Sequence, residues 1–143
     1  MFFSIEQIAG MRTYVKRHKF YGYHRLSRYT DEELQKICNG IGGDNMPSIL
    51  NKAISALNPS LVPASFVHDV EWFESRGTER EFLKTNARFE LNGHLAADIK
   101  YPRWWQYPAR RWVKRKARLF REILDSVAFS HYQECFLEKK KND

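Results

Sequence analysis

The sequence has few cysteines and no long hydrophobic run. Only Cys38 and Cys135 occur among 143 residues, which excludes a framework of several disulfides and leaves either one bridge or two buried free thiols. No apolar stretch approaches the ~20 residues that a transmembrane helix needs. The first residues lack the basic and apolar segments of a secretory signal, so we expect a protein that stays in the cytoplasm of the producing cell or joins a virion.

Acidic residues are outnumbered by basic ones, 17 Asp and Glu against 24 Lys and Arg, which leaves a net charge of +7. This excess favours a polyanionic partner, either nucleic acid or an anionic membrane surface, although a solvated basic face gives the same balance. Hydrophobic residues make up 43% of the chain, enough for a core, and its length suits one domain over residues 1–143.

The alternation of apolar and polar residues that marks β-strands is also missing, and apolar residues recur at helical spacing instead. Capping boxes indicate helix starts at Ser4, Thr30 and Thr78. Prolines and glycines mark the other boundaries, with Gly93 expected to end a helix. We predict an all-α domain with helices over residues 4–16, 30–40, 47–57, 63–77, 78–93 and 109–127.

The region after residue 100 divides into an irregular segment and a long helix. Pro102 and Pro108 interrupt residues 101–108, which we do not expect to form one regular helix. The helix that follows is expected to be amphipathic. The residues whose spacing gives this amphipathic pattern are Trp112, Val113, Lys116, Leu119, Phe120, Ile123, Leu124 and Val127.

The helices predicted over residues 63–77 and 78–93 are joined so closely that we expect them to be antiparallel neighbours. Counted from the turn, His68 then lies opposite a position near Thr85 and Asn86, and Asn86 lies on the same stripe of its helix as Phe82 and Phe89. The Asn86 side-chain oxygen is placed to accept the Nδ1 proton of His68, which leaves Nε2 as a general base. The alternative is that His68 is an ordinary core histidine with its hydrogen bonds satisfied, and that Asp69 is a surface or ion-paired carboxylate.

A glycine-rich segment, residues 38–43 (CNGIGG), directly follows one predicted helix. Glycines let a loop turn its backbone carbonyls toward a hard cation, and the Asp69 carboxylate can complete an oxygen cage. Taken alone, the glycines equally suit a helix stop followed by a turn. Together with His68, they suggest a calcium-dependent hydrolase.

These two motifs resemble the phospholipase A2 superfamily, particularly its cysteine-poor bacterial, viral and phage members. That family has a C-x-G-x-G-G calcium loop and, further along, a helix with His-Asp followed three positions later by an aromatic residue. Here the matching residues are 38–43, then His68 and Asp69, then Trp72. The resemblance covers about residues 38–92. It implies a calcium-type loop preceding an antiparallel two-helix hairpin.

The resemblance also implies roles for individual residues. The main-chain carbonyls of Cys38, Gly40 and Gly42, with the Asp69 carboxylate, would bind Ca²⁺. His68 would be the general base that activates water for attack on the sn-2 ester of a phosphoglyceride. Calcium would polarise the ester carbonyl and hold the phosphate.

Two positions depart from the family pattern. The second helix of the family supplies an Asp in a D-x-x-F pattern that supports the His, and here Asn86 stands at that position, before Phe89. An Asn can orient an imidazole but does not offset its positive charge. Trp72 stands where a Tyr is usual.

Residues 101–121 are rich in cations and aromatic side chains and contain no acidic residue. Trp and Tyr favour the membrane–water interface, and Lys or Arg attract anionic lipids. The same composition suits nucleic acid, and it also suits a helix with aromatics in the core and cations in solvent. The candidate surface residues are Arg103, Trp104, Trp105, Arg110, Arg111, Trp112, Lys114, Arg115, Lys116 and Arg118.

The function that these patterns predict is calcium-dependent hydrolysis of a phosphoglyceride acyl ester at an anionic membrane surface, with His68 and Asn86 as catalytic residues. Two alternatives stay open. One is a basic nucleic-acid-binding accessory protein, and the other is a catalytically inactive phage structural protein on the same scaffold.

Overall fold

The computed structural model describes residues 3–38, 58–127, 129 and 141. The described residues are mostly helical and include no strand, so the predicted all-α class is confirmed. None of their helices is long and apolar enough to span a bilayer. The elements, in chain order, are α1 (Ile5–Arg17), η1 (Tyr23–Arg28), α2 (Asp31–Cys38), η2 (Pro59–Leu61), α4 (Val62–Glu74), α5 (Glu79–Lys100), η3 (Trp104–Gln106) and α6 (Tyr107–Val127).

The capping residues fix where the helices begin. The Gln7 backbone N–H donates to Ser4 Oγ at 3.2 Å while the Ser4 N–H donates to Gln7 Oε1 at 2.8 Å, which completes the predicted capping box of α1. Thr30 makes the same reciprocal pair with Glu33 before α2. Thr78 accepts from the Glu81 N–H before α5. These three predicted helix starts are confirmed. The helix predicted over residues 47–57 lies outside the described residues.

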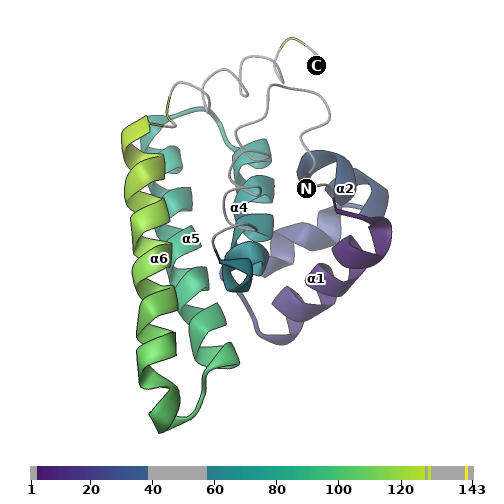
Figure 1. Cartoon of the computed structure of the whole chain (residues 1–143). Coiled ribbons are helices and arrows are strands. Elements are labelled where there is room, and N and C mark those ends of the chain that lie inside the picture. Colours follow the sequence, from purple (N-terminus) through teal and green to yellow (C-terminus); the bar gives the residue numbers. More distant parts are fainter. Residues whose placement is uncertain (1–2, 39–57, 128, 130–140, 142–143) are drawn as a thin grey trace.

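α4 is the central element of the fold. α4, α5 and α6 lie side by side as three long helices, and α1 and α2 pack against α4 from the other side (Figure 1). Short segments at opposite ends join α4 to α5 and α5 to α6, so that the chain reverses direction at each. One core fills the space among the three long helices, with Phe89 and Phe120 among its members. A second core joins α4 to α1 and α2.

α5 is longer than the sequence predicted. It continues through Gly93 to Lys100, so the expectation that Gly93 closes this helix is wrong. Gly93 is there for packing, because a Cβ atom at this position would lie 2.6 Å from the Cβ of Ala117 on α6. The absence of a side chain lets α5 and α6 approach closely. Their contact therefore extends along most of both helices.

α6 begins at Tyr107 rather than at Ala109, because its first turn accommodates Pro108. Its buried stripe is narrower than predicted and consists of Val113, Ala117, Phe120 and Leu124. Other apolar residues of the amphipathic pattern are exposed. They are Trp112, Leu119 and Ile123, which form a second stripe at helical spacing along the same helix.

Candidate active site

The central part of α4 is buried on all sides. Every residue from Ala64 to Trp72 is buried, because α5 covers one side of the helix and α1 with α2 cover the other. Ser65, His68, Asp69 and Glu71 therefore lie in the interior despite their polar side chains. Burying a polar group costs free energy unless a hydrogen bond replaces its water. The partners of these side chains thus identify the interactions that offset their burial.

His68 and Asn86 meet between α4 and α5. The His68 Nε2 atom lies 2.8 Å from Asn86 Oδ1, and both side chains are buried. The contact predicted from the sequence is therefore present. Because an amide oxygen only accepts hydrogen bonds, His68 Nε2 carries the proton in this pair.

The nitrogen atom that faces Asn86 is the opposite of the predicted one. We expected Nδ1 to donate and Nε2 to stay free, whereas Nε2 donates and Nδ1 faces the other way. Nδ1 sits close to its own backbone, so only the distal nitrogen reaches across to the neighbouring helix. With Nε2 protonated, the neutral ring has its lone pair on Nδ1.

Nδ1 of His68 lies beside Asp69. It is 3.9 Å from Asp69 Oδ1, and both side chains are fully buried. No described residue makes a hydrogen bond to Nδ1. The ring is enclosed by Trp72 and Phe89, whose centroids lie 4.7 Å and 5.7 Å from its own. Tight packing and one directional hydrogen bond therefore fix the imidazole with its basic nitrogen toward Asp69.

Asp125 on α6 joins this arrangement, although no pattern in the sequence predicts it. Asn86 Nδ2 donates to Asp125 Oδ1 at 2.9 Å, which links α4, α5 and α6 through a row of three side chains: His68, Asn86 and Asp125. A helical pattern alone does not show which residue of α6 faces Asn86, because that depends on how far α5 and α6 slide along each other. We refer to these three residues as the buried polar row.

Arg121 holds Asp125 in place from the solvent side. Its Nε lies 3.5 Å from Asp125 Oδ2, and its Nη1 donates to Glu90 Oε2 at 2.7 Å. The hydrogen bond to Glu90, followed by the charges of Glu90 and Asp125, raises the pKa of the Arg121 guanidinium. One oxygen of Asp125 thus faces Arg121 while the other accepts from Asn86.

Cys38 and Asp69 bring the end of α2 to the site. Cys38 is the last residue of α2 and is buried. Burial, and then the nearby Asp69 charge, raise the pKa of its thiol well above the ordinary value. A neutral thiol is a poor metal ligand, so any contribution of Cys38 to a cation site comes from its main-chain carbonyl. Gly40 and Gly42, the other predicted ligands, lie outside the described residues.

Two groups in the described part of this region are of the kind that attract a hard cation. The last carbonyls of a helix lack intrahelical partners and carry partial negative charge, which favours cations. Here the end of α2 lies near the Asp69 carboxylate. Oxygen donors of both kinds suit Ca²⁺. Within the described ranges, no group of three or more His, Cys, Asp or Glu side chains forms a metal cluster.

Other buried polar residues make contacts between elements of the fold. The Arg88 guanidinium donates to Glu71 Oε2, with its Nε at 2.6 Å. Asn92 bonds the backbone N–H and C=O of Tyr21 at 2.7 and 3.0 Å. Gly22 has φ 87° and would place a Cβ 2.6 Å from Glu71 Oε1. The first contact joins α5 to α4, and the other two hold the connection between α1 and α2 against α5 and α4.

The aromatic residues of the basic segment lie on the surface. Trp104 is 82% exposed and Trp105 56%, and Tyr107 and Trp112 are each 52% exposed. They occupy η3 and the start of α6, at the end of the molecule where α5 meets α6 (Figure 1). The alternative in which several of these aromatics belong to the core is therefore wrong. We call η3 and the first turns of α6, residues 103–112, the aromatic tip.

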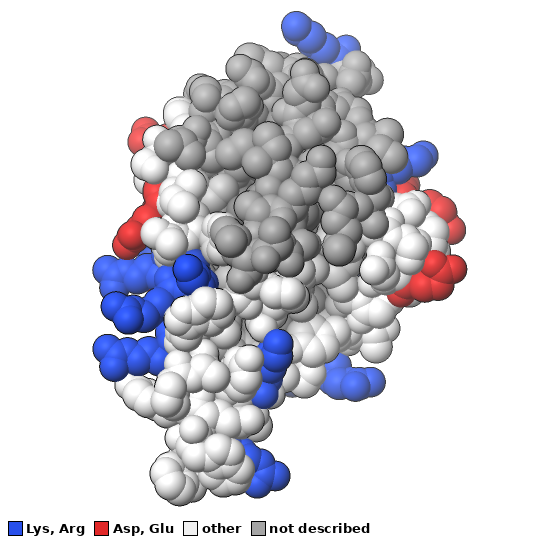
Figure 2. Space-filling view, viewed as in Figure 1, with Lys and Arg blue, Asp and Glu red and all other residues white. Residues whose placement is uncertain are grey.

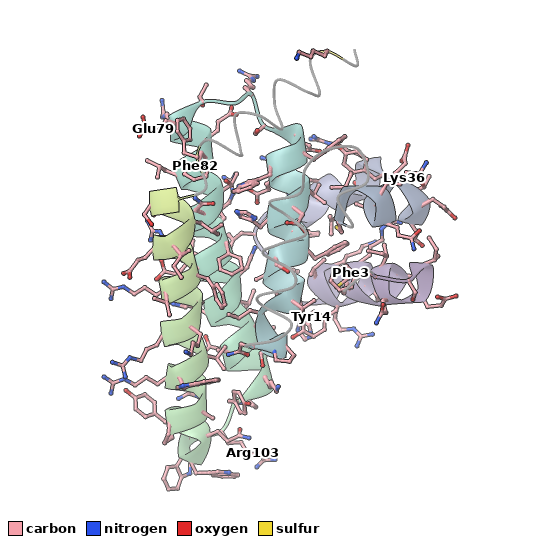
Figure 3. All side chains as sticks on the ribbon, turned by 45° about the horizontal axis from the view of Figure 1, so that its top comes forward. Phe3, Tyr14, Lys36, Glu79, Phe82 and Arg103 are labelled. Atoms are coloured by element: carbon pink, nitrogen blue, oxygen red, sulfur yellow. The ribbon has the colours of Figure 1, made fainter. Side chains whose placement is uncertain are left out.

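Cations accompany these aromatic rings. Arg103 lies over the Trp105 ring, Arg110 over Tyr107 and Lys116 over Trp112, each within 6 Å of the centroid. In Figure 3, Arg103 lies at the opposite end of α5 from Glu79 and Phe82. Figure 2 shows Lys and Arg side chains gathered over the side of the molecule that α6 forms.

Not all of the predicted cations are equally available. Lys114 pairs with Asp98 at 2.8 Å, and Arg118 pairs with Glu122 at 3.2 Å. Arg110 donates to the Tyr101 carbonyl at 3.0 Å and lies 3.9 Å from Asp98. Two further cations, Arg111 and Arg115, are exposed, and neither pairs with an acidic side chain in the described part of the chain.

Comparisons with models of protein families, with curated protein sequences and with solved structures give no significant match to this chain. The case for a function therefore rests on the motif residues and on the geometry described above.

Proposed function

We propose that the protein hydrolyses an acyl ester of a phosphoglyceride in a calcium-dependent reaction of the phospholipase A2 type. The observation that supports this most is the position of His68. One ring nitrogen is tied to Asn86 and the other faces Asp69. A general base needs this asymmetry, because one nitrogen has to hold its proton while the other accepts one.

In the proposed reaction, His68 Nδ1 takes a proton from a water molecule whose oxygen attacks the ester carbonyl carbon. The bond to the glycerol oxygen then breaks, and the same nitrogen returns the proton to that leaving oxygen. The products are a fatty acid and a lysophospholipid, with no covalent enzyme intermediate. Asn86 keeps Nε2 protonated throughout, and Trp72 and Phe89 hold the ring.

Asp69 and the carbonyl of Cys38, with Gly40 and Gly42, would hold the calcium ion. When bound, Ca²⁺ supplies a Lewis acid that offsets negative charge on the substrate. The position of the α2 end near Asp69 supports this assignment, because both groups attract a cation.

The aromatic tip and α6 form the proposed docking surface for an anionic membrane. Exposed Trp and Tyr side chains gain free energy at the lipid interface, and each cation near an anionic surface adds about 1 kcal/mol. The exposed stripe of Trp112, Leu119 and Ile123 runs from the tip toward Asp125, which belongs to the buried polar row. An amphipathic surface of this kind lies on a bilayer without crossing it.

Fatty-acid release from phosphatidylglycerol vesicles tests the chemistry. We expect the full chain to release fatty acid with calcium and not with a calcium chelator, and His68→Ala to lower the rate by about 10²–10⁴-fold. His24→Ala is the matched control, since His24 is an exposed histidine remote in sequence from the site. Absence of calcium-dependent release by folded wild-type protein would refute the proposed activity.

Calcium binding has a readout that needs no turnover. A ligand that binds only the folded state raises the unfolding temperature, and the rise grows with the logarithm of the ligand concentration once this exceeds the dissociation constant. We expect calcium to stabilise the wild type and to stabilise Asp69→Asn much less. Equal stabilisation of both proteins would contradict the assignment of Asp69 as a ligand.

Binding to vesicles and to DNA, each measured over a range of salt concentrations, tests which partner the docking surface prefers. Binding to phosphatidylglycerol vesicles should exceed binding to single-stranded DNA, and Trp104→Ser with Trp105→Ser should weaken vesicle binding. A preference for DNA, with affinity falling steeply as salt rises, would instead support the nucleic-acid alternative.

A further inference from the structure

We propose that Asp125 is a positioning residue for His68 and acts through Asn86. This role rests on the proposed function of His68 as a general base. Asp125 supplies the carboxylate that position 86 lacks, and Asn86 lies between this carboxylate and the imidazole. The observation is the continuous row His68 Nε2 to Asn86 Oδ1 at 2.8 Å and Asn86 Nδ2 to Asp125 Oδ1 at 2.9 Å.

Every hydrogen bond in the row has one allowed direction. Asp125 as a carboxylate only accepts, so it faces the NH₂ group of Asn86. That choice turns the amide oxygen of Asn86 toward His68. The oxygen also only accepts, so His68 donates from Nε2 and keeps its lone pair on Nδ1, the nitrogen beside Asp69.

Asn86 alone does not impose this order. The two ends of a side-chain amide have nearly the same shape, and which end faces a partner is decided by the surrounding hydrogen bonds. A flipped Asn86 would present its NH₂ group to Nε2 and thereby favour the ring with its proton on Nδ1. A ring in that form has no basic nitrogen facing Asp69, so it does not accept a proton there.

Asp125 itself is held in place. Arg121 lies 3.5 Å from Asp125 Oδ2 and is anchored to Glu90 at 2.7 Å. Asn86 is completely buried, whereas the Asp125 side chain is 28% exposed. The carboxylate thus keeps part of its hydration while it directs a buried amide. The Asp69 carboxylate is already buried beside Nδ1 of His68, and this arrangement avoids burying a second full charge against the other side of the ring.

The tautomer of neutral His68 tests the role directly. With ¹⁵N-labelled histidine, long-range ¹H–¹⁵N spectra distinguish a ring protonated at Nε2 from one protonated at Nδ1, and His68→Gln assigns the signal. We expect the Nε2-protonated form in the wild type and a mixture of both forms in Asp125→Asn. The matched control is Glu122→Gln, an exposed carboxylate on α6 that pairs with Arg118. It should keep the wild-type signal.

Exchanging the two side chains provides a rescue. In the double variant Asn86→Asp with Asp125→Asn, the carboxylate accepts directly from Nε2 and is supported by the new amide. We expect this variant to restore the Nε2-protonated form. If Asp125→Asn fails to fold, Arg121→Gln loosens the same carboxylate and should shift the tautomer part of the way. An unchanged His68 signal in the folded Asp125 variant, or in Arg121→Gln if that substitute is needed, would overturn the role.

Activity gives the second readout. We expect Asp125→Asn to lower calcium-dependent fatty-acid release by about 10–100-fold, as is typical when the partner of a site residue is removed, and the exchanged pair to recover most of it. The two claims fail separately. A wild type without hydrolytic activity would refute the proposed function even with the tautomer shift observed, whereas an active wild type with an unchanged tautomer in Asp125→Asn would refute only the role of Asp125.

Discussion

The buried polar row and the aromatic tip depart from ordinary burial in opposite ways. In the row, His68 and Asn86 lie in the core, where apolar side chains are usual. At the tip, Trp104 and Trp105 lie in solvent, where charged side chains are usual. Buried polar groups and exposed aromatic patches are the two departures that carry information about function. The row sits among three helices and the tip sits at their end (Figure 1).

Mutations in the two regions should therefore differ in their effect on the stability of the fold. The row remains stable only because each donor meets an acceptor, so a change there affects both stability and chemistry. The tip contributes little to the packed interior, so a change there should leave stability nearly unchanged and affect only the proposed docking. The proposed chemistry and the proposed docking therefore belong to regions that mutations distinguish.

The largest effect on stability is expected at the centre of the row. Asn86→Leu keeps similar volume but leaves the His68 N–H and one Asp125 oxygen without their partner. We expect the free energy of unfolding to fall by about 2–4 kcal/mol. Chemical denaturation measures this, and the exposed neighbour Lys84→Ala should change it by less than ~0.5 kcal/mol. Equal effects of the two variants would show that the row contributes nothing special.

A smaller effect is expected between the two regions, at Gly93. Gly93→Val inserts a side chain where a Cβ already lies 2.6 Å from the Ala117 Cβ, and we expect a loss of about 1–3 kcal/mol as α5 and α6 separate. Gly10→Ala is the matched control. No atom lies within 4 Å of its new Cβ, so it should stabilise α1 by roughly 0.5–1 kcal/mol. Thermal unfolding of both variants measures the difference, and a stabilised Gly93→Val would contradict the close approach of the helices.

Acid should lower the stability of the fold through the Glu74 carboxylate, which lies away from the tip. Burial alone would raise the pKa of Glu74, but hydrogen bonds from Arg25 and Tyr29 and the charges of Arg28 and Arg25 leave it below its ordinary 4.5. A lowered folded-state pKa contributes stability that is present above pH 4.5 and is lost as pH falls through the folded pKa. Unfolding curves should show Glu74→Gln with a weaker acid dependence in this window. Glu32→Gln, at an exposed position, should have the acid dependence of the wild type. If Glu74→Gln also has the wild-type acid dependence, the prediction is wrong.

The smallest effect on stability is expected at the tip. Trp104→Ser, which removes a ring that is 82% exposed, should change the free energy of unfolding by less than ~0.5 kcal/mol. Binding to anionic vesicles should nevertheless weaken, as cosedimentation measures. Leu91→Ser, at an exposed position on α5 away from the tip, is the control for general loss of apolar surface. Equal losses of vesicle binding in the two variants would argue against a specific docking surface.

The sequence predicts the local parts of this structure well. Helix starts at Ser4, Thr30 and Thr78 follow from capping chemistry within four residues, and the structure has the corresponding hydrogen bonds. The contact of His68 with Asn86 follows from the short connection between two helices. In each case the controlling interaction lies close along the chain, so a pattern of residue types is enough.

The sequence fails where distant segments decide. Gly93 looks like a helix stop, but its role depends on Ala117, which lies on another helix. The nitrogen of His68 that bonds Asn86 depends on the separation of α4 and α5. Asp125 joins the row only because α5 and α6 pack in one register. These features come from tertiary packing, which no local pattern encodes.

The separation of chemistry from docking is tested most directly by initial rates on two substrates, anionic phosphatidylglycerol vesicles and a monomeric short-chain phosphatidylglycerol, both with calcium. Trp104→Ser combined with Trp105→Ser should lose most of its rate on vesicles and keep its rate on the monomeric lipid, whereas His68→Ala should lose both. Equal losses of the tip variant on the two substrates, or no calcium-dependent rate of the wild type on either, would contradict the account.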